Sequence, residues 1–357
     1  NTLHKITLEQ TGWGDRVRVF SPDDGDYFRD TSPQFSLRTW VAFCAHDLLQ
    51  MMLHDVRPVE RRKGAANEIY ERSTRELIAA MERPSKGSLA HGFGELVTGM
   101  WGARDILKRA AKQFAEARCP TREVPTVSVV GEIYVRLDPF ANDFIVEKLE
   151  ERGVRVRFAP FIEWLEYTAF LAEERVIERK ARRDDDPISI GITGVVQRAS
   201  LEMMYQMCAR ELGWPARAKV PQAIEAARGY VNPELAGEAV LTLGGPVHEF
   251  QEGLVDGVVS VGPHECMPNK IAEAQYGKVL EDMNLPYLVL AINGDPIDTE
   301  ALDRFVYDLH EIHRRKLGKS LGAVSWSLGQ PTKIESTVVP VEALTSRRRG
   351  RRDAEAN

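Results

Sequence analysis

The clearest hydrophobic pattern lies between residues 126 and 160. Residues 126–134 form an almost uncharged run rich in β-branched side chains, which is typical of a strand covered on both faces. Residues 135–138 turn polar and are a predicted loop. From Pro139 the apolar residues fall at helical spacing until Gly153, and a second apolar run covers 154–160. This order predicts a βαβ unit with parallel strands and a right-handed crossover.

Polar side chains follow the first of these strands. In open parallel sheets, ligands bind at the carboxyl ends of the strands. The first candidates for a site are therefore Glu132, Tyr134, Arg136 and Asp138.

The flanking sequence predicts further layers. Apolar positions at helical spacing indicate successive helices across residues 36–118. After the βαβ unit, residues 240–244 are a predicted small-residue turn, and strands are predicted at 257–261 and 287–292. Helices follow those strands, the last one over 299–316. The predicted fold class is α/β: a Rossmann-like parallel sheet with helices on both faces, preceded by a helical layer.

Changes of pattern divide the chain into four predicted parts. Residues 1–35 are the predicted end of an upstream α/β lobe, beginning with a helix at 3–11 and a strand at 16–21. A helical connecting region covers 36–120, and the Rossmann-like lobe covers 121–316. The basic stretch 317–357 loses its periodicity and is predicted to be disordered. Because the chain starts without methionine inside a helical pattern, we expect it to be the C-terminal part of something longer.

The composition of the chain argues against several classes of partner and location. The 357 residues are 43% hydrophobic and 28% charged with a net charge of −6, an ordinary globular composition that gives no reason to expect nucleic acid as a partner. No apolar run approaches the roughly 20 residues of a membrane helix, and no signal peptide is visible. A cytoplasmic location and no membrane contact are expected.

Four cysteines are too widely spread for a disulfide scaffold or a CxxC zinc site. Cys44 and Cys208 lie on apolar helical stripes and are predicted core residues, and Cys119 lies in a linker without a partner motif. Cys266 differs, because it follows a buried-type strand and precedes a helix that Pro268 can start. A helix N-terminus lowers a thiol pKa, so we expect a reactive or ligating thiolate.

Three roles remain open for Cys266 from the residues alone. A covalent nucleophile needs a base, which His264 could supply, with Glu265 as a further partner. Zinc or an iron–sulfur cluster needs three or four ligands, and no second close cysteine is present. At the other polar strand end, helix capping by Asp295 or Asp298 is favoured over magnesium binding.

Four ordered segments together resemble a known family. Residues 131–153, 159–167, 260–275 and 292–298 are similar to the C-terminal region of large CoA-substrate-specific enzyme activase proteins. That region resembles 2-hydroxyacyl-CoA dehydratase subunits and double-cubane-cluster proteins. The resemblance implies two Rossmann-like lobes that hold an iron–sulfur cluster through cysteines, with ATP-hydrolysing activase domains upstream. It also implies ATP-driven, low-potential electron transfer to a CoA-linked substrate.

Cys266 matches the cysteine of the family's GPxxCMP motif, which implies a ligand of a [4Fe–4S] or double-cubane cluster. The other cysteines do not match, so the remaining ligands are expected upstream of Asn1. Glu132, Arg136, Asp138, His264 and Glu265 would line the catalytic cavity. This segment alone is expected to be inactive and to act with the activase domains or subunit. The alternatives are a docking domain that kept the fold without the cluster and a cysteine-nucleophile acyl transferase.

Overall fold

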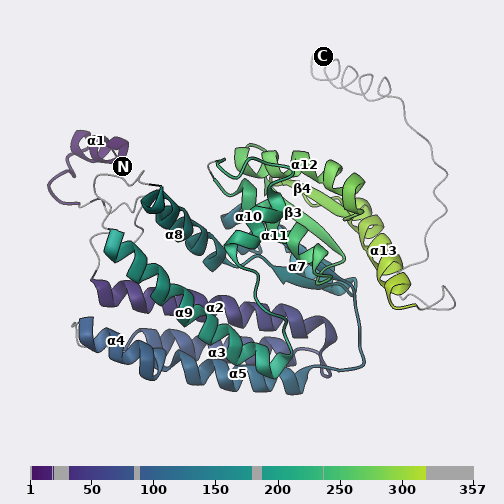
Figure 1. The fold of residues 1–357 in the computed structure, drawn as a ribbon, viewed down its shortest axis with the longest axis horizontal. Helices are drawn as coiled ribbons and strands as arrows, with labels where there is room; N and C mark the ends of the chain where they lie inside the picture. Colours follow the sequence, from purple (N-terminus) through teal and green to yellow (C-terminus); the bar gives the residue numbers. More distant parts are fainter. Residues whose placement is uncertain are drawn as a thin grey trace, which may run out of the picture. The chain divides into compact units, whose positions relative to one another are not determined.

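A four-stranded, all-parallel sheet with the order β2-β1-β3-β4 forms the centre of the α/β part of the protein (Figure 1). The computed structural model describes residues 2–17, 19, 32–83, 89–178, 187–235 and 237–318. The strands are β1 (Thr126–Gly131), β2 (Arg155–Phe158), β3 (Gly257–Pro263) and β4 (Tyr287–Ile292). The predicted parallel pairing of β1 with β2 is confirmed, and β3 pairs with the other edge of β1.

Helices cover both faces of this sheet, as the α/β fold class predicts. Val127 and Val129 of β1 pack in one core with α7 (Ile145–Glu151) and α13 (Thr299–Lys316). Val130, on the opposite face, packs in another core with α11 (Ala239–Gln251) and α12 (Met267–Met283). Because successive strand residues point to opposite faces, the apolar run of β1 serves both cores.

The connection between β1 and β2 differs from the prediction. Residues 133–137 are not a strand end and loop but a short helix, α6 (Ile133–Leu137), because the Glu132 carboxylate accepts hydrogen bonds from the Tyr134 and Val135 N–H groups. The following helix, α7, begins at Ile145 rather than at Pro139. Residues 139–144 form turns, and Phe144 adopts a left-handed conformation at φ 55°.

The predicted turn at 240–244 is also wrong, since these residues lie inside α11. Gly244 allows close packing of this helix, because a Cβ at this position would lie 1.9 Å from the carbonyl oxygen of Ala223 in α10 (Val220–Ala227). Pro246 lies within the same helix and has no N–H to offer the carbonyl of Thr242. The Tyr276 hydroxyl donates to that carbonyl at 2.7 Å instead.

The predicted helical layer is confirmed. It comprises α2 (Pro33–Val56), α3 (Ala65–Met81), α4 (Leu89–Thr98), α5 (Ala103–Ala117) and, from later in the chain, α9 (Pro187–Leu212). Figure 1 shows α2 and α9 lying over α3, α4 and α5. Helix α8 (Phe161–Ile177) packs against α2 and α9, and α2 also packs directly against β2. Cys44 and Cys208 are both fully buried in the core of this layer, as predicted.

The remaining described elements are α1 (Thr2–Gln10), η1 (Arg57–Val59) and η2 (Met100–Gly102). Helix α1 agrees with the prediction for residues 3–11. The predicted strand at 16–21 falls largely outside the described residues, and so does the basic stretch beyond Gly318. Residues 1–317 form one unit and 318–357 another. None of the helices in the described ranges combines the length and apolar character that a membrane crossing requires.

Candidate functional site

The carboxyl ends of β1 and β3 lie side by side, and the polar strand-end residues gather there. Gly131 pairs with Val261, and the Glu132 N–H donates to the Val261 carbonyl at 2.9 Å. Gly131 has φ +125°, and a Cβ at this position would lie 1.8 Å from the Val261 oxygen. Only glycine permits this close approach, which brings Glu132 beside the loop that carries Cys266.

Cys266 is the N-cap residue of α12 and is partly exposed. Its pKa is raised, first by burial and then by the charges of Glu238, Glu132 and Glu273, against a lowering by the Asn269 N–H. The predicted lowering of this thiol pKa is therefore wrong. Burial of the thiol outweighs the stabilisation of the thiolate at the helix N-terminus, and the surrounding carboxylates add to the raised pKa.

Two of the predicted carboxylates serve the local backbone. Glu132 caps α6, and the Asp138 carboxylate accepts a hydrogen bond from the Ala141 N–H at 2.7 Å. Tyr134, His264 and Glu265 are exposed. Within the part of the chain that the structure describes, no side-chain hydrogen bond or ion pair joins His264 or Glu265 to Cys266. Their predicted catalytic roles stay predictions. Asp298 caps α13 through the Glu300 and Ala301 N–H groups, as predicted.

A buried polar cluster holds the loop between β3 and α12 in place. The Ser260 hydroxyl lies 3.1 Å from both Asn269 Oδ1 and Glu273 Oε1. Asn269 donates to Glu273 at 2.7 Å, and Lys270 pairs with the second Glu273 oxygen at 2.6 Å. Ser260 and Asn269 are fully buried, so this network fixes the position of the Cys266 backbone.

Thiols are not gathered at this edge. Cys44 and Cys208 lie in the helical core, and Cys119 lies between α5 and β1. Among the described residues, no group of three or more His, Cys, Asp or Glu side chains is arranged to hold a metal ion. Cys266 is thus the single thiol that the described part of the chain presents at the strand ends.

Arg136 lies in a different place from the other predicted residues. Its side chain is 3% exposed, and its guanidinium donates to the carbonyls of Gly131 (3.1 Å) and Pro160 (3.4 Å). Its Nε–H is buried without a hydrogen-bond partner. Arg136 lines a cavity of about 340 Å³ between the helical layer and the sheet.

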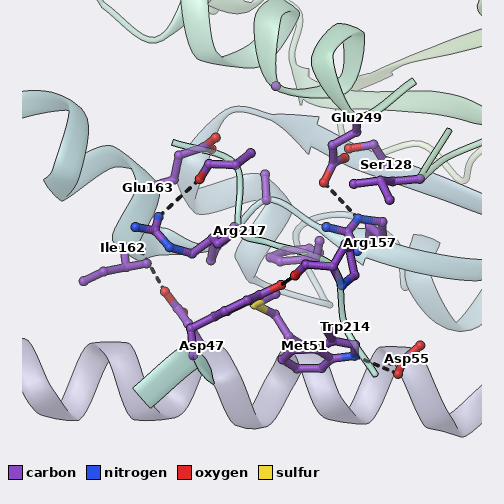
Figure 2. A pocket seen from close by; sticks show the side chains of 18 of the residues that line it. Asp47, Met51, Asp55, Ser128, Arg157, Ile162, Glu163, Trp214, Arg217 and Glu249 are labelled. Atoms are coloured by element: carbon purple, nitrogen blue, oxygen red, sulfur yellow. Dashed lines mark hydrogen bonds and ion pairs between the residues drawn. The ribbon is translucent and has the colours of Figure 1, made fainter. Parts of the chain in front are cut away.

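Figure 2 shows the arrangement of this cavity, which we call the interlayer cavity. Asp47 and Met51 extend from α2, while Ser128 and Arg157 extend from the strands on the opposite side. Most charged side chains that line it form ion pairs or hydrogen bonds. These are Arg157 with Glu249 (2.9 Å), Arg217 with Glu166 (2.9 Å), Arg155 with Asp55 (3.2 Å) and Trp214 with Asp55 (3.0 Å).

Two carboxyl groups of the cavity have strongly raised pKa values. Burial raises the pKa of Asp47 to about 7, against the hydrogen bond from the Ile162 N–H and the charge of Arg136. Burial likewise raises the pKa of Glu163 to about 7, opposed by Arg136 and reinforced by Glu249. Both groups can therefore change protonation state near neutral pH.

Sequence reasoning did not find the interlayer cavity. Its charged residues come from α2, the end of α5, α6, β2, α8, the α9–α10 loop and α11, so no single short motif contains them. One signal was present: Asp47 lies on the apolar stripe of α2 between Cys44 and Met51. An acidic residue on a buried helix face needs a partner or a raised pKa.

Comparison with known proteins gives little further information. No family model matches the chain, and no solved structure matches it. The chain is similar to the HTH-type transcriptional regulator BetI of Proteus mirabilis (strain HI4320), with 27% identity over 108 residues. This match covers 30% of the chain and 51% of the regulator, so the chain spans about half the length of the curated relative it matches.

Proposed function

We propose that this chain is a lobe of a low-potential electron-transfer system similar to the CoA-substrate-specific enzyme activases and 2-hydroxyacyl-CoA dehydratases, with Cys266 as one ligand of an iron–sulfur cluster. The observation that supports it is the position of Cys266. Its thiol is partly exposed at the carboxyl ends of two adjacent parallel strands, where open α/β sheets bind their ligands.

The residues at this edge fit one ligand of a cluster and not a complete set. Iron–sulfur clusters are held by about four cysteine thiolates, and the described residues supply one at the strand ends. The carboxylates of Glu132, Glu238 and Glu273 favour the protonated thiol, so iron must displace a proton from Cys266. The proposal therefore places the other ligands outside this chain, upstream of Asn1.

The chain's own residues have defined tasks in this proposal. The Ser260, Asn269 and Glu273 network holds the Cys266 backbone, and Glu132 and Glu238 set the negative charge around its thiol. A bound iron–sulfur cluster would supply one-electron transfer at low potential. The partners are upstream ATP-hydrolysing activase domains or an activase subunit, with a CoA thioester as substrate, in the cytoplasm.

A second candidate function follows because Cys266 is the single thiol that the described residues present at the strand ends. A domain that kept the fold and lost the other ligands would dock the activase part without holding a cluster. The two functions differ in whether iron binds at all. A nucleophilic Cys266 is less well supported, because burial and neighbouring carboxylates raise its pKa.

The test is the content of iron and acid-labile sulfide in the full polypeptide that contains this chain, purified without oxygen. Several irons per chain, lost in Cys266→Ala and retained in Cys119→Ala, are expected. The Cys119 variant is the matched control, because this thiol lies away from the strand ends. Iron that persists in Cys266→Ala contradicts the ligand assignment, and no iron in any variant favours the docking domain.

A further inference from the structure

We propose that the interlayer cavity binds a small zwitterion, an amino acid or another amino-carboxylate, with the ligand carboxylate on Arg136 and the ligand ammonium on Glu163. This inference does not depend on the cluster, since it concerns a different set of residues. The site is assembled from α6, which carries Arg136, the first turn of α8, which carries Glu163, and α2.

The first argument is that two opposite charges lining one cavity lack ion-pair partners. Within the described residues, Arg136 has no carboxylate within 4.0 Å, and its Nε–H has no acceptor. Two other arginines that line the cavity, Arg157 and Arg217, have carboxylate partners. A buried, unpaired guanidinium N–H is costly, so a ligand oxygen that accepts from it would stabilise the site.

Glu163 is the matching group of opposite sign. Its carboxylate makes no hydrogen bond or ion pair with any residue that the structure describes, whereas Asp47 accepts from the Ile162 N–H at 2.8 Å. Arg136 and Glu163 influence one another electrostatically without forming an ion pair. Both groups line the interlayer cavity, so a ligand bound there can contact both.

The two charges together select the ligand class. A simple carboxylate would satisfy Arg136 and leave Glu163 buried without a donor. A simple amine would donate hydrogen bonds to Glu163, but its positive charge would be repelled by Arg136. An amino-carboxylate offers an acceptor to Arg136 and donors to Glu163, so both buried groups gain charge-assisted hydrogen bonds.

The dimensions and walls of the cavity are compatible with such a ligand. Its volume of about 340 Å³ is at the lower end of the range of small-molecule sites, about 300–1,000 Å³. Apolar and aromatic side chains complete the walls, among them Leu48, Met51, Phe158, Leu201 and Tyr205. Gly213, Pro215 and Lys219 of the α9–α10 loop line the cavity and are exposed, so the cavity reaches solvent at this loop.

Binding is tested with the full polypeptide that contains this chain, by thermal shift and titration calorimetry. The probes are the twenty standard amino acids, γ-aminobutyrate, butyrate and butylamine. At least one amino-carboxylate is expected to bind saturably, while butyrate and butylamine bind at least tenfold more weakly. Saturable binding of butyrate or butylamine alone, or of no probe, overturns the proposal.

Variants locate the site. Glu163→Gln keeps the shape of the side chain and is expected to weaken binding at least tenfold. Glu174→Gln, on the same helix α8 and outside the cavity lining, is the matched control and should bind normally. Gly245→Ala provides a second variant, since its Cβ would lie 3.5 Å from Glu163 Oε1, an ordinary contact that narrows the cavity. Gly245→Ala is expected to fold and to bind the amino-carboxylate several-fold more weakly. Unchanged binding in both Glu163→Gln and Gly245→Ala overturns the proposal.

Discussion

Asp47 of α2 accepts a hydrogen bond from the backbone N–H of Ile162 in α8, at a distance of 2.8 Å. The N-cap residue of α8 is Pro160, whose side chain cannot cap, so a carboxylate from the helical layer does this instead. The contact joins residues 115 positions apart and connects the helical layer to the α/β part of the protein. It also places a buried carboxyl group beside Arg136 and Glu163 in the interlayer cavity.

Asp47→Asn is expected to stabilise the protein at alkaline pH. Burial raises the Asp47 pKa from 3.8 to about 7, so the native state binds this proton more tightly and stability falls as pH rises from about 4 to 7. The cost at pH 8 is on the order of 4 kcal/mol. Asparagine keeps an acceptor for Ile162 but loses the attraction of Arg136.

We therefore expect the free energy of unfolding of this variant to rise by about 2 kcal/mol at pH 8 and by much less at pH 5. Urea unfolding at the two pH values is the measurement. Asp308→Asn, at an exposed position of α13, is the control and should change little at either pH. An equal gain at pH 5 and pH 8 would show that ionisation of Asp47 is not the cause.

Asp256→Asn is expected to destabilise the protein, whereas Asp47→Asn is expected to stabilise it. Burial by itself would raise the pKa of Asp256. Hydrogen bonds from His313 (3.1 Å), Lys316 (2.8 Å) and the Thr126 N–H outweigh burial and lower this pKa to about 2. A lowered pKa contributes stability above about pH 4, which is lost as pH falls towards 2. We expect the variant to lose about 2 kcal/mol at pH 7.

Chemical denaturation and hydrogen exchange of α13 measure this loss, because His313 and Lys316 lie in the last turn of that helix. Asp303→Asn is the matched control. Its ion pair with Arg152 is exposed on the aspartate side and is worth at most about 1 kcal/mol. A control loss as large as that of Asp256→Asn would contradict the assigned role.

Cys266 is expected to react slowly with iodoacetamide at neutral pH in the protein free of iron. Burial and the nearby carboxylates raise its pKa, so the alkylation rate should climb about tenfold per pH unit between pH 7 and 8. Glu238→Gln removes one of these charges and should increase the rate at pH 7.5 by about threefold.

The rate is followed by mass spectrometry in a Cys119→Ser background. Cys119 must be removed because a hydrogen bond with the Thr121 hydroxyl lowers its pKa and makes it the competing reactive thiol. Exposed Glu234 supplies the control variant, Glu234→Gln, which should leave the rate unchanged. A fast reaction at pH 7 in the parent protein would instead restore the nucleophile hypothesis.

Gly131→Ala is expected to prevent stable folding of the α/β part, with a loss of more than about 3 kcal/mol. The residue has φ +125°, and the added Cβ would lie 1.8 Å from the Val261 carbonyl oxygen in the neighbouring strand. Gly64→Ala separates the two causes, since Gly64 has φ +88° and open space around its Cβ. It should cost about 1 kcal/mol; equal losses by thermal unfolding would mean that backbone strain and not the clash dominates.

Local patterns in the sequence determined much of the fold. The β-branched run at 126–131 encodes a strand buried on both faces, and the stripes of α2 and α9 place Cys44 and Cys208 in a core. Side-chain period and burial are local properties, so they can be inferred without coordinates. Turn and cap chemistry was harder to infer. Glu132 was predicted to be a site residue after the strand, yet its carboxylate caps the five-residue helix α6 (Ile133–Leu137).

The tertiary structure decided the electrostatics and the cavity. Burial is the main cause of the raised Cys266 pKa, and Glu238, which lies 28 positions earlier and approaches when α11 packs against α12, adds to it. The charges of the interlayer cavity converge from seven separate parts of the chain, and Arg136 lines this cavity. Burial raises the pKa values of Asp47 and Glu163 only once those layers close, and long-range desolvation of this kind leaves no local pattern in a sequence.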